Sequence, residues 1–333
     1  MIAVPTHCVR VRKGLALASA SALLFAGCSS GTDSIAEREA PPTESSSEPD
    51  LNIVATTTIW ADIASRSLCG LEVASVIPAG ADPHTFETSL ADRATLEQAD
   101  LVVANGLALE EGLVDLLATV ADGGTPVIEM TEAVAIRDMG DDHDDEHSDD
   151  KDHADEHHHD HSGSDPHIWL DPINVASTVN LITEAAIDAG FDTSVRACAQ
   201  DFIDEIEALD IEIADDLSAI PSDRRFLVTN HDALGYFAER YGFEVVGTVI
   251  PSLSTLAETN PADLADLAAI IEELDIPTVF SEVQASARDA DALADAIPGL
   301  TVVALDTGSL RDTDDDYLSM MRRNVTAIAE ALG

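Results

Sequence analysis

The sequence predicts an α/β protein with two lobes, each built on a roughly four-stranded, mostly parallel sheet flanked by helices. A long rigid helix is expected to join them. Three observations predict this fold. Short apolar runs alternate with helical stretches in both halves of the chain, which is typical of parallel sheets covered by helices. One uninterrupted helical signal separates the two alternating regions. An acidic, histidine-rich segment interrupts the first of them.

The N-terminal residues have the pattern of a secretory signal, predicted to span residues 1–27. A basic stretch precedes the apolar run 14–27, which is too short to cross a bilayer comfortably. The run ends in Leu-Phe-Ala-Gly-Cys28, which resembles a bacterial lipobox, so we expect Cys28 to carry lipid. The alternative is a plain secretory signal followed by a chance cysteine. Residues 28–50 are rich in Ser, Pro and Glu and are expected to form a disordered tether.

The charge of the chain argues against nucleic-acid binding. The 333 residues carry a formal net charge of −48, with only 16 Lys and Arg. No basic stripe is present to follow a phosphate backbone. The acidic excess raises the local concentration of cations, or it reflects a salty habitat; composition alone leaves both explanations open.

Residues 51–190 form the predicted first lobe. Its strands are expected at 51–56, 72–77, 101–104 and 126–130, and its helices at 60–67, 89–98 and 173–189. Residues 141–161 interrupt this lobe with seven histidines among eleven acidic residues. The segment has no hydrophobic periodicity, and we expect a mobile loop that binds metal ions weakly and at several places. A solvated polyelectrolyte without a specific site is the alternative.

The longest helical signal covers 192–220, within the predicted linker helix 191–220. Apolar or small residues recur there in steps of three and four: Val195, Cys198, Phe202, Ile206, Leu209, Ile213 and Leu217. Such spacing marks one continuous face of a helix. A helix of this length extends roughly 40 Å. Because it lies between two α/β patterns, we interpret it as a strut between lobes rather than as a helix of one lobe.

Residues 221–333 form the predicted second lobe. Strands are expected at 226–229, 244–249, 278–281 and 301–305, and helices at 233–241, 261–274 and 317–332. The helix at 261 has a clear start, because Asn260 is a suitable N-cap and Pro261 suits the first helical position. Cys69 and Cys198 remain in the mature chain, and an oxidising compartment would permit a disulfide between them. The sequence leaves their pairing open.

Polar side chains follow the ends of several predicted strands. Outside the signal and the acidic loop, the chain has three histidines: His84, His167 and His231. Asp306 follows the strand at 301–305, and Glu282 ends the strand at 278–281. Ligands of open α/β sheets bind beyond the carboxyl ends of the strands, so we expect these residues to line one cleft between the lobes. Any one histidine alone would more often be an ordinary loop residue.

Three imidazoles and one carboxylate match the ligands of tetrahedral zinc. Proline precedes both His84 and His167, and it restricts the backbone there, which lowers the cost of ordering a ligand. A closed shell of four protein ligands indicates storage or transport. The chain has no His-Glu-x-x-His motif and no recognisable Ser or Cys nucleophile, so we expect no enzymatic activity. An extracellular zinc enzyme with an open coordination position is the alternative.

Four segments together carry a family resemblance. They are 78–87 with Asp-Pro-His84, 165–172 with Asp-Pro-His167-Ile-Trp, 229–238 with Thr-Asn-His231, and 317–324. These segments resemble the metal-binding lipoproteins, or solute-binding proteins, of bacterial ABC importers for zinc and manganese. The likeness extends over about 51–332. The histidine at 231 and the His-rich loop are typical of zinc-type members.

The resemblance implies a ligand set and a set of partners. His84, His167 and His231 would bind Zn²⁺, with Mn²⁺ or iron as the alternative metal. The family's fourth ligand, an aspartate, aligns with Gly308, so we expect Asp306 to replace it, with Glu282 or a water as the fallback. The protein would be a monomer anchored by lipid to the outer face of the cell membrane or in the periplasm. It would deliver metal to an ABC permease and its ATPase. A surface metal buffer or adhesin that works without a permease is a further alternative.

Overall fold

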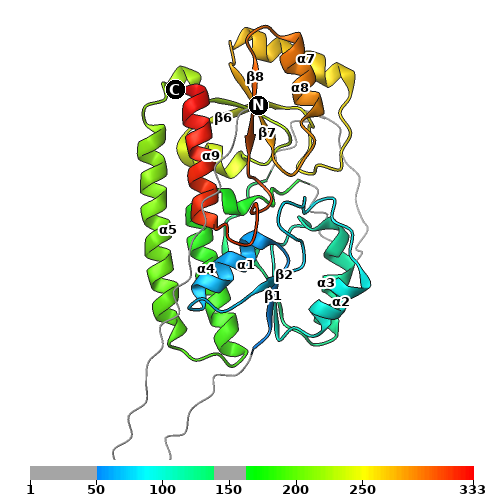
Figure 1. Ribbon diagram of the computed structural model, residues 1–333, viewed down its shortest axis with the longest axis vertical. Helices are drawn as coiled ribbons and strands as arrows, with labels where there is room; N and C mark the ends of the chain where they lie inside the picture. Colours follow the sequence, from blue (N-terminus) through cyan, green and yellow to red (C-terminus); the bar gives the residue numbers. More distant parts are fainter. Residues whose placement is uncertain (1–50, 139–162) are drawn as a thin grey trace, which may run out of the picture. The chain divides into compact units, whose positions relative to one another are not determined.

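A computed structural model describes residues 51–138 and 163–333. The predicted signal peptide, Cys28, the tether and the histidine-rich segment 141–161 lie outside these residues. Within the described residues, both predicted sheets and the long helix are present (Figure 1), so the predicted fold class is confirmed.

The first sheet consists of four parallel strands in the order β2-β1-β3-β4. The strands are β1 (Ile53–Ala55), β2 (Ala74–Ser75), β3 (Leu101–Ala104) and β4 (Val127–Glu129). The two central strands are wholly buried, and their alternate residues face different layers. Val54 and Val102 pack with Leu96 of α2 (Leu90–Glu97) and Val120 of α3 (Val114–Asp122). Ile53 instead joins a cluster that contains residues of α1 (Thr58–Ser67).

The second sheet repeats this arrangement with the order β6-β5-β7-β8, again all parallel. Its strands are β5 (Phe226–Thr229), β6 (Glu244–Thr248), β7 (Thr278–Glu282) and β8 (Thr301–Leu305). The chain order reverses between β5 and β7. Such a switch point opens a crevice at the carboxyl ends of the strands, and His231 and Glu282 lie at the ends of these two strands.

Four of the helices begin at identifiable capping residues. Thr57 caps α1 (Thr58–Ser67), and Ser89 with Asp92 forms a capping box on α2 (Leu90–Glu97). Asp171 caps α4 and Asn260 caps α7, each just before a proline at the first helical position. The remaining helices are α3 (Val114–Asp122), α4 (Pro172–Asp188), α5 (Val195–Leu217), α6 (Gly235–Tyr241), α7 (Pro261–Glu273), α8 (Arg288–Ala296) and α9 (Tyr317–Leu332). Short 3-10 turns cover Glu111–Leu113, Met130–Ala133, Ile168–Leu170 and Ser222–Arg224.

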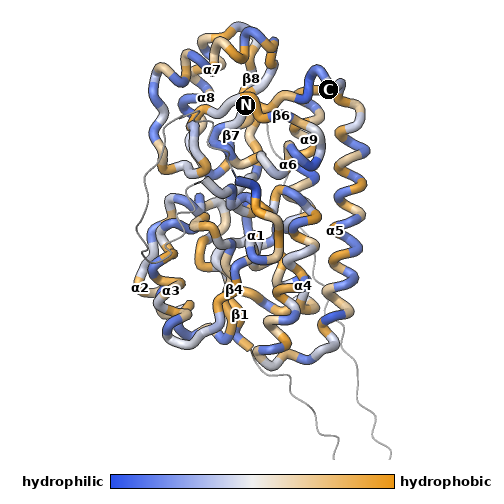
Figure 2. The backbone as a smooth tube through the Cα atoms, turned by 180° about the vertical axis from the view of Figure 1, so that it is seen from behind, coloured by the Kyte–Doolittle hydropathy of each residue, from blue (hydrophilic) through white to orange (hydrophobic). Residues whose placement is uncertain are grey.

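The long helix α5 packs against α1 and α4 on the side of the first sheet and against α9 near the second (Figure 1). The predicted apolar positions Val195, Phe202, Ile206, Leu209, Ile213 and Leu217 are buried. Hydrophobic and hydrophilic residues alternate along its tube in Figure 2, as expected for an amphipathic helix. One apolar cluster includes residues of β1, β5, α5 and α9, so the two sheets share a core.

Some details differ from the expectations. The long helix is shorter than 192–220, because it begins at Val195 and ends at Leu217. Helices α3 and α8 were not among the predicted ranges. A disulfide joins Cys69, just after α1, to Cys198 of α5, with Cα atoms 5.3 Å apart. No described helix is both long and apolar enough to span a bilayer. The division into lobes at 51–190, 191–220 and 221–333 stays a prediction.

Candidate metal centre

His84 lies in the loop that follows β2. Its backbone N–H donates to Asp82 Oδ1 over 3.0 Å, a local turn that the intervening Pro83 stiffens. Gly80, earlier in the loop, has a φ of +76° and donates its N–H to the Leu310 carbonyl of the other lobe over 2.9 Å. The loop is therefore tied to the other lobe at Gly80 and stiffened locally before His84, whose side chain is 4% exposed.

His167 precedes the turn Ile168–Leu170. The buried carboxylate of Asp165 accepts the His167 backbone N–H over 3.0 Å and lies 2.8 Å from its Nδ1. Arg137 neutralises the other carboxylate oxygen over 3.2 Å. The side-chain amide of Asn105, at the end of β3, donates to the Pro166 carbonyl over 2.9 Å. These contacts fix the orientation of the imidazole, whose Nε2 faces away from Asp165.

His231 follows β5 at the switch point of the second sheet. Its backbone carbonyl accepts a hydrogen bond from the Thr229 hydroxyl over 2.7 Å. Its Nδ1 contacts Oε1 of Glu282, the last residue of β7. The second oxygen of Glu282 accepts from Thr307 Oγ1 over 2.8 Å and from Gln284 Nε2 over 2.9 Å. Both oxygens of the Glu282 carboxylate therefore have partners, and the carboxylate lies on the Nδ1 side of the His231 ring.

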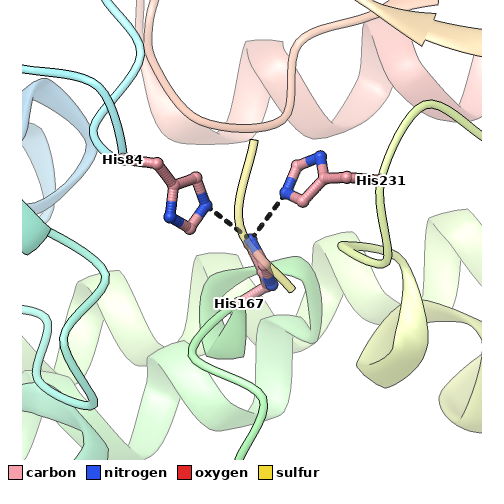
Figure 3. A group of neighbouring side chains, drawn as sticks. All are labelled: His84, His167 and His231. Carbon is pink, nitrogen blue, oxygen red and sulfur yellow. Dashed lines mark hydrogen bonds between the residues drawn. The ribbon is translucent and has the colours of Figure 1, made fainter. Parts of the chain in front are cut away.

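The three imidazoles converge through their Nε2 atoms (Figure 3). Nε2 of His167 lies 3.3 Å from that of His84 and 3.1 Å from that of His231. Nitrogens bound to one tetrahedral zinc at about 2.0–2.1 Å lie roughly 3.3 Å apart. Among the described residues, these three form a group whose candidate ligand atoms all lie within 4.8 Å of one another.

Burial and the neighbouring charges set the protonation of the three histidines. Burial and the nearby imidazoles hold the pKa of His84 well below its usual range, and burial and His231 do the same for the pKa of His167. Burial also lowers the pKa of His231, but the Glu282 carboxylate outweighs this effect and raises it. Two of the imidazoles are therefore neutral and ready to coordinate near neutral pH.

Neither expected carboxylate joins the three nitrogens. Asp306 is buried, but its oxygens accept from Arg311 Nε over 2.8 Å and from Arg323 Nε over 3.0 Å. The arginines hold it in an ion-paired network away from the group of candidate ligand atoms. Glu282 contacts the far side of His231 and orients it. Gly308, the position that aligns with the family's aspartate, lines the cavity around the imidazoles but has no side chain to offer as a ligand.

The cavity around the imidazoles is small. It is far smaller than the roughly 300–1,000 Å³ that is typical of a cavity for an organic ligand. It is lined by residues of both lobes, among them Asp82, Leu109, Trp169, Gln284 and Thr307. The dimensions therefore fit a single ion. The indole of Trp169 donates to the Thr307 carbonyl over 2.7 Å, so the aromatic residue of the His-Ile-Trp segment supports the cavity wall.

Comparison with known proteins agrees with this architecture. The family model described as zinc-uptake complex component A, periplasmic, matches residues 53–331. The chain belongs to this family. The family resemblance noted in the sequence is thereby confirmed, and the members are solute-binding components of metal importers rather than enzymes.

Named relatives bind either of two metals. The manganese-binding lipoprotein MntA of Halalkalibacterium halodurans is 28% identical over 290 residues, covering 85% of this chain and 88% of the relative. The zinc-binding protein TroA of Treponema pallidum is 27% identical over 263 residues, covering 76% and 79%. The solved structure of TroA matches with a TM-score of 0.73 at 25% identity, covering 85% of this chain and 99% of TroA. By their names, the first of these relatives binds manganese and the second binds zinc.

Proposed function

We propose that this protein captures a zinc ion on Nε2 of His84, His167 and His231 and delivers it to the permease of an ABC importer. The convergence of three buried imidazole nitrogens carries this proposal. The ligands come from three separate segments of the chain, and the shared core holds these segments in place. A water molecule is proposed for the fourth tetrahedral position, because Asp306 and Glu282 are engaged elsewhere.

The donor set favours zinc over manganese. Imidazole suits zinc, copper and nickel, whereas manganese prefers carboxylate and water oxygens. All three proposed ligands are nitrogens, and no carboxylate joins their group among the described residues. Affinities of nitrogen sites also rise from manganese to zinc in the general order of divalent metals. We therefore propose zinc as the cargo, although a named relative at 28% identity binds manganese.

Transport would need no covalent chemistry. The protein would carry zinc from outside the cell to the permease, anchored through a lipid on Cys28. The relative MntA of Halalkalibacterium halodurans is called a lipoprotein, which supports this placement. Because α5 packs along helices of both lobes, we propose that zinc release follows from the shift of one ligand-bearing loop rather than from a large rotation of the lobes.

Competition calorimetry tests the choice of metal. Purified metal-free protein is titrated with Zn²⁺ in the presence of excess Mn²⁺, and the experiment is repeated with His231→Ala. We expect one zinc per chain, little effect of manganese, and a large loss of affinity in the variant. Tighter binding of manganese than of zinc would overturn the assignment. Uptake of radioactive zinc by cells with and without the protein tests delivery, and equal uptake would refute it.

A further inference from the structure

His84 differs from the other two histidines in the surroundings of its Nδ1 atom, which lies on the side of the ring that faces away from the cluster. Nδ1 of His167 meets Asp165, and Nδ1 of His231 meets Glu282. Nδ1 of His84 is buried and has no hydrogen-bond partner among the described residues. The carboxylate that faces it belongs to Glu111, whose Oε1 lies 3.8 Å away. This distance is just beyond a hydrogen bond.

Zinc on Nε2 changes what Nδ1 requires. An imidazole that coordinates through Nε2 is neutral and carries its proton on Nδ1, so a buried Nδ1–H needs an acceptor. Carboxylates commonly supply it, and they orient the ring and make the coordinating nitrogen more basic. We propose that Glu111 is a positioning residue for His84 that accepts the Nδ1–H when zinc is bound. This inference rests on the proposed zinc site.

The backbone around Glu111 is fixed against the loop that carries His84. The neighbouring Glu110 is buried and accepts the Asn105 backbone N–H over 3.0 Å. Gly112 lies so close to that loop that a Cβ there would be 2.2 Å from the Phe86 carbonyl oxygen. Glu111 is thus held beside His84 from both sides, and the proposed hydrogen bond requires its carboxylate to approach Nδ1 by about 1 Å.

Glu111 also contacts the second lobe. The same Oε1 accepts a hydrogen bond from Ser254 Oγ, in the segment between β6 and α7. The adjacent Thr255 hydroxyl donates to Asp82 Oδ2 over 2.6 Å. Asp82 is the residue whose other oxygen accepts the His84 backbone N–H. Two hydroxyls of the second lobe therefore hold the two carboxylates that flank His84.

The carboxylate of Glu111 has enough lone pairs to accept from Ser254 and from His84 together. Zinc bound to His84 then becomes connected through Glu111 to a segment of the opposite lobe. The Glu111 side chain is 37% exposed, so water competes for its oxygens. Its contribution therefore belongs at the low end of the range of about 10–100-fold in metal affinity that such partners give.

Zinc affinity of three variants, measured by chelator competition, tests the inference. Glu111→Ala is expected to bind zinc about 10-fold more weakly than the wild type. Glu111→Gln keeps an acceptor oxygen and should recover part of this loss. Glu87→Gln is the matched control, because Glu87 is exposed in the same loop as His84 and loses the same charge. It should bind as the wild type does.

A nuclear magnetic resonance spectrum of the zinc-loaded protein separates a positioning role from a structural one. The His84 Nδ1 proton should be visible and downfield in the wild type and in Glu87→Gln, and it should move upfield or exchange with water in Glu111→Ala. Equal affinities for Glu111→Ala and Glu87→Gln, or an unchanged Nδ1 proton, would overturn the inference. If His84→Ala itself bound zinc as well as the wild type, the proposed site would fail instead.

Discussion

Replacing Glu282 with glutamine should weaken zinc binding, whereas replacing Asp306 with asparagine should not. Both carboxylates are buried near the end of a strand in the second sheet. Glu282 contacts Nδ1 of His231, and Asp306 contacts two arginines. The two variants therefore compare two buried carboxylates, of which only Glu282 orients a proposed ligand.

The contacts of Glu282 set the expected magnitude. A glutamine oxygen still accepts from His231 Nδ1, but without the charge that strengthens the bond. Its amide group would face Gln284 Nε2, which now donates to Glu282 Oε2 over 2.9 Å. Partners of this kind are worth about 10–100-fold in metal affinity. Because the Glu282 side chain is only 4% exposed, we expect roughly 30-fold, or about 2 kcal/mol.

Asp306→Asn should instead lower stability. Arg311 and Arg323 lose a charged acceptor, and both are partly exposed, so we expect a loss of about 1–3 kcal/mol in the free energy of unfolding. Chelator competition gives the zinc affinities, and urea denaturation of the metal-free proteins gives the stabilities. The reasoning is refuted if Asp306→Asn loses zinc affinity while Glu282→Gln retains it, because Asp306 would then act as a ligand.

Three further predictions concern the pH dependence of zinc binding, the disulfide and the histidine-rich segment. Glu282 raises the pKa of His231, so zinc must displace a proton from this imidazole at mildly acidic pH. Calorimetry should therefore show a zinc affinity that falls about 10-fold per pH unit below that pKa. A zinc affinity that stays constant across pH 5–8 would contradict this prediction. The Cys69–Cys198 disulfide closes a loop of 129 residues. Replacing both cysteines with serine should lower the free energy of unfolding, measured by urea denaturation, by about 2–5 kcal/mol. A double serine variant as stable as the wild type would refute this prediction. Finally, His231→Ala should lower zinc affinity far more than deletion of residues 141–161, and equal losses in a chelator titration would make that segment the main site.

The fold and the convergence of the three histidines could be predicted because they depend on local pattern. Buried runs such as Leu101–Ala104 identify parallel strands without knowledge of their neighbours. In parallel sheets the residues after such strands gather on one edge, so His231 could be placed there from its position alone. The Asp-Pro-His segment around His167 also contains the carboxylate that orients its imidazole, because Asp165 contacts the ring of His167 two positions further along the chain.

The roles of the carboxylates could not be predicted because they depend on distant partners. Asp306 is engaged by Arg323, seventeen residues later in α9, and helix packing decides this contact. Glu282, at the end of β7, contacts His231, which follows β5 and lies 51 positions earlier in the chain. The spacing near Gly308 suggested Asp306 as a replacement ligand, but spacing does not show that arginines occupy its oxygens. The pairing of Cys69 with Cys198 likewise depends on how α1 packs against α5.

X-ray absorption spectroscopy of the protein loaded with one zinc per chain tests the central claim most directly. The account predicts three imidazole nitrogens at about 2.0–2.1 Å and a fourth ligand that is not an imidazole, an oxygen of water. The imidazole signal should fall by one ring in each of the variants His84→Ala, His167→Ala and His231→Ala. A shell dominated by carboxylate oxygens, or a spectrum that none of the three substitutions changes, would contradict the account.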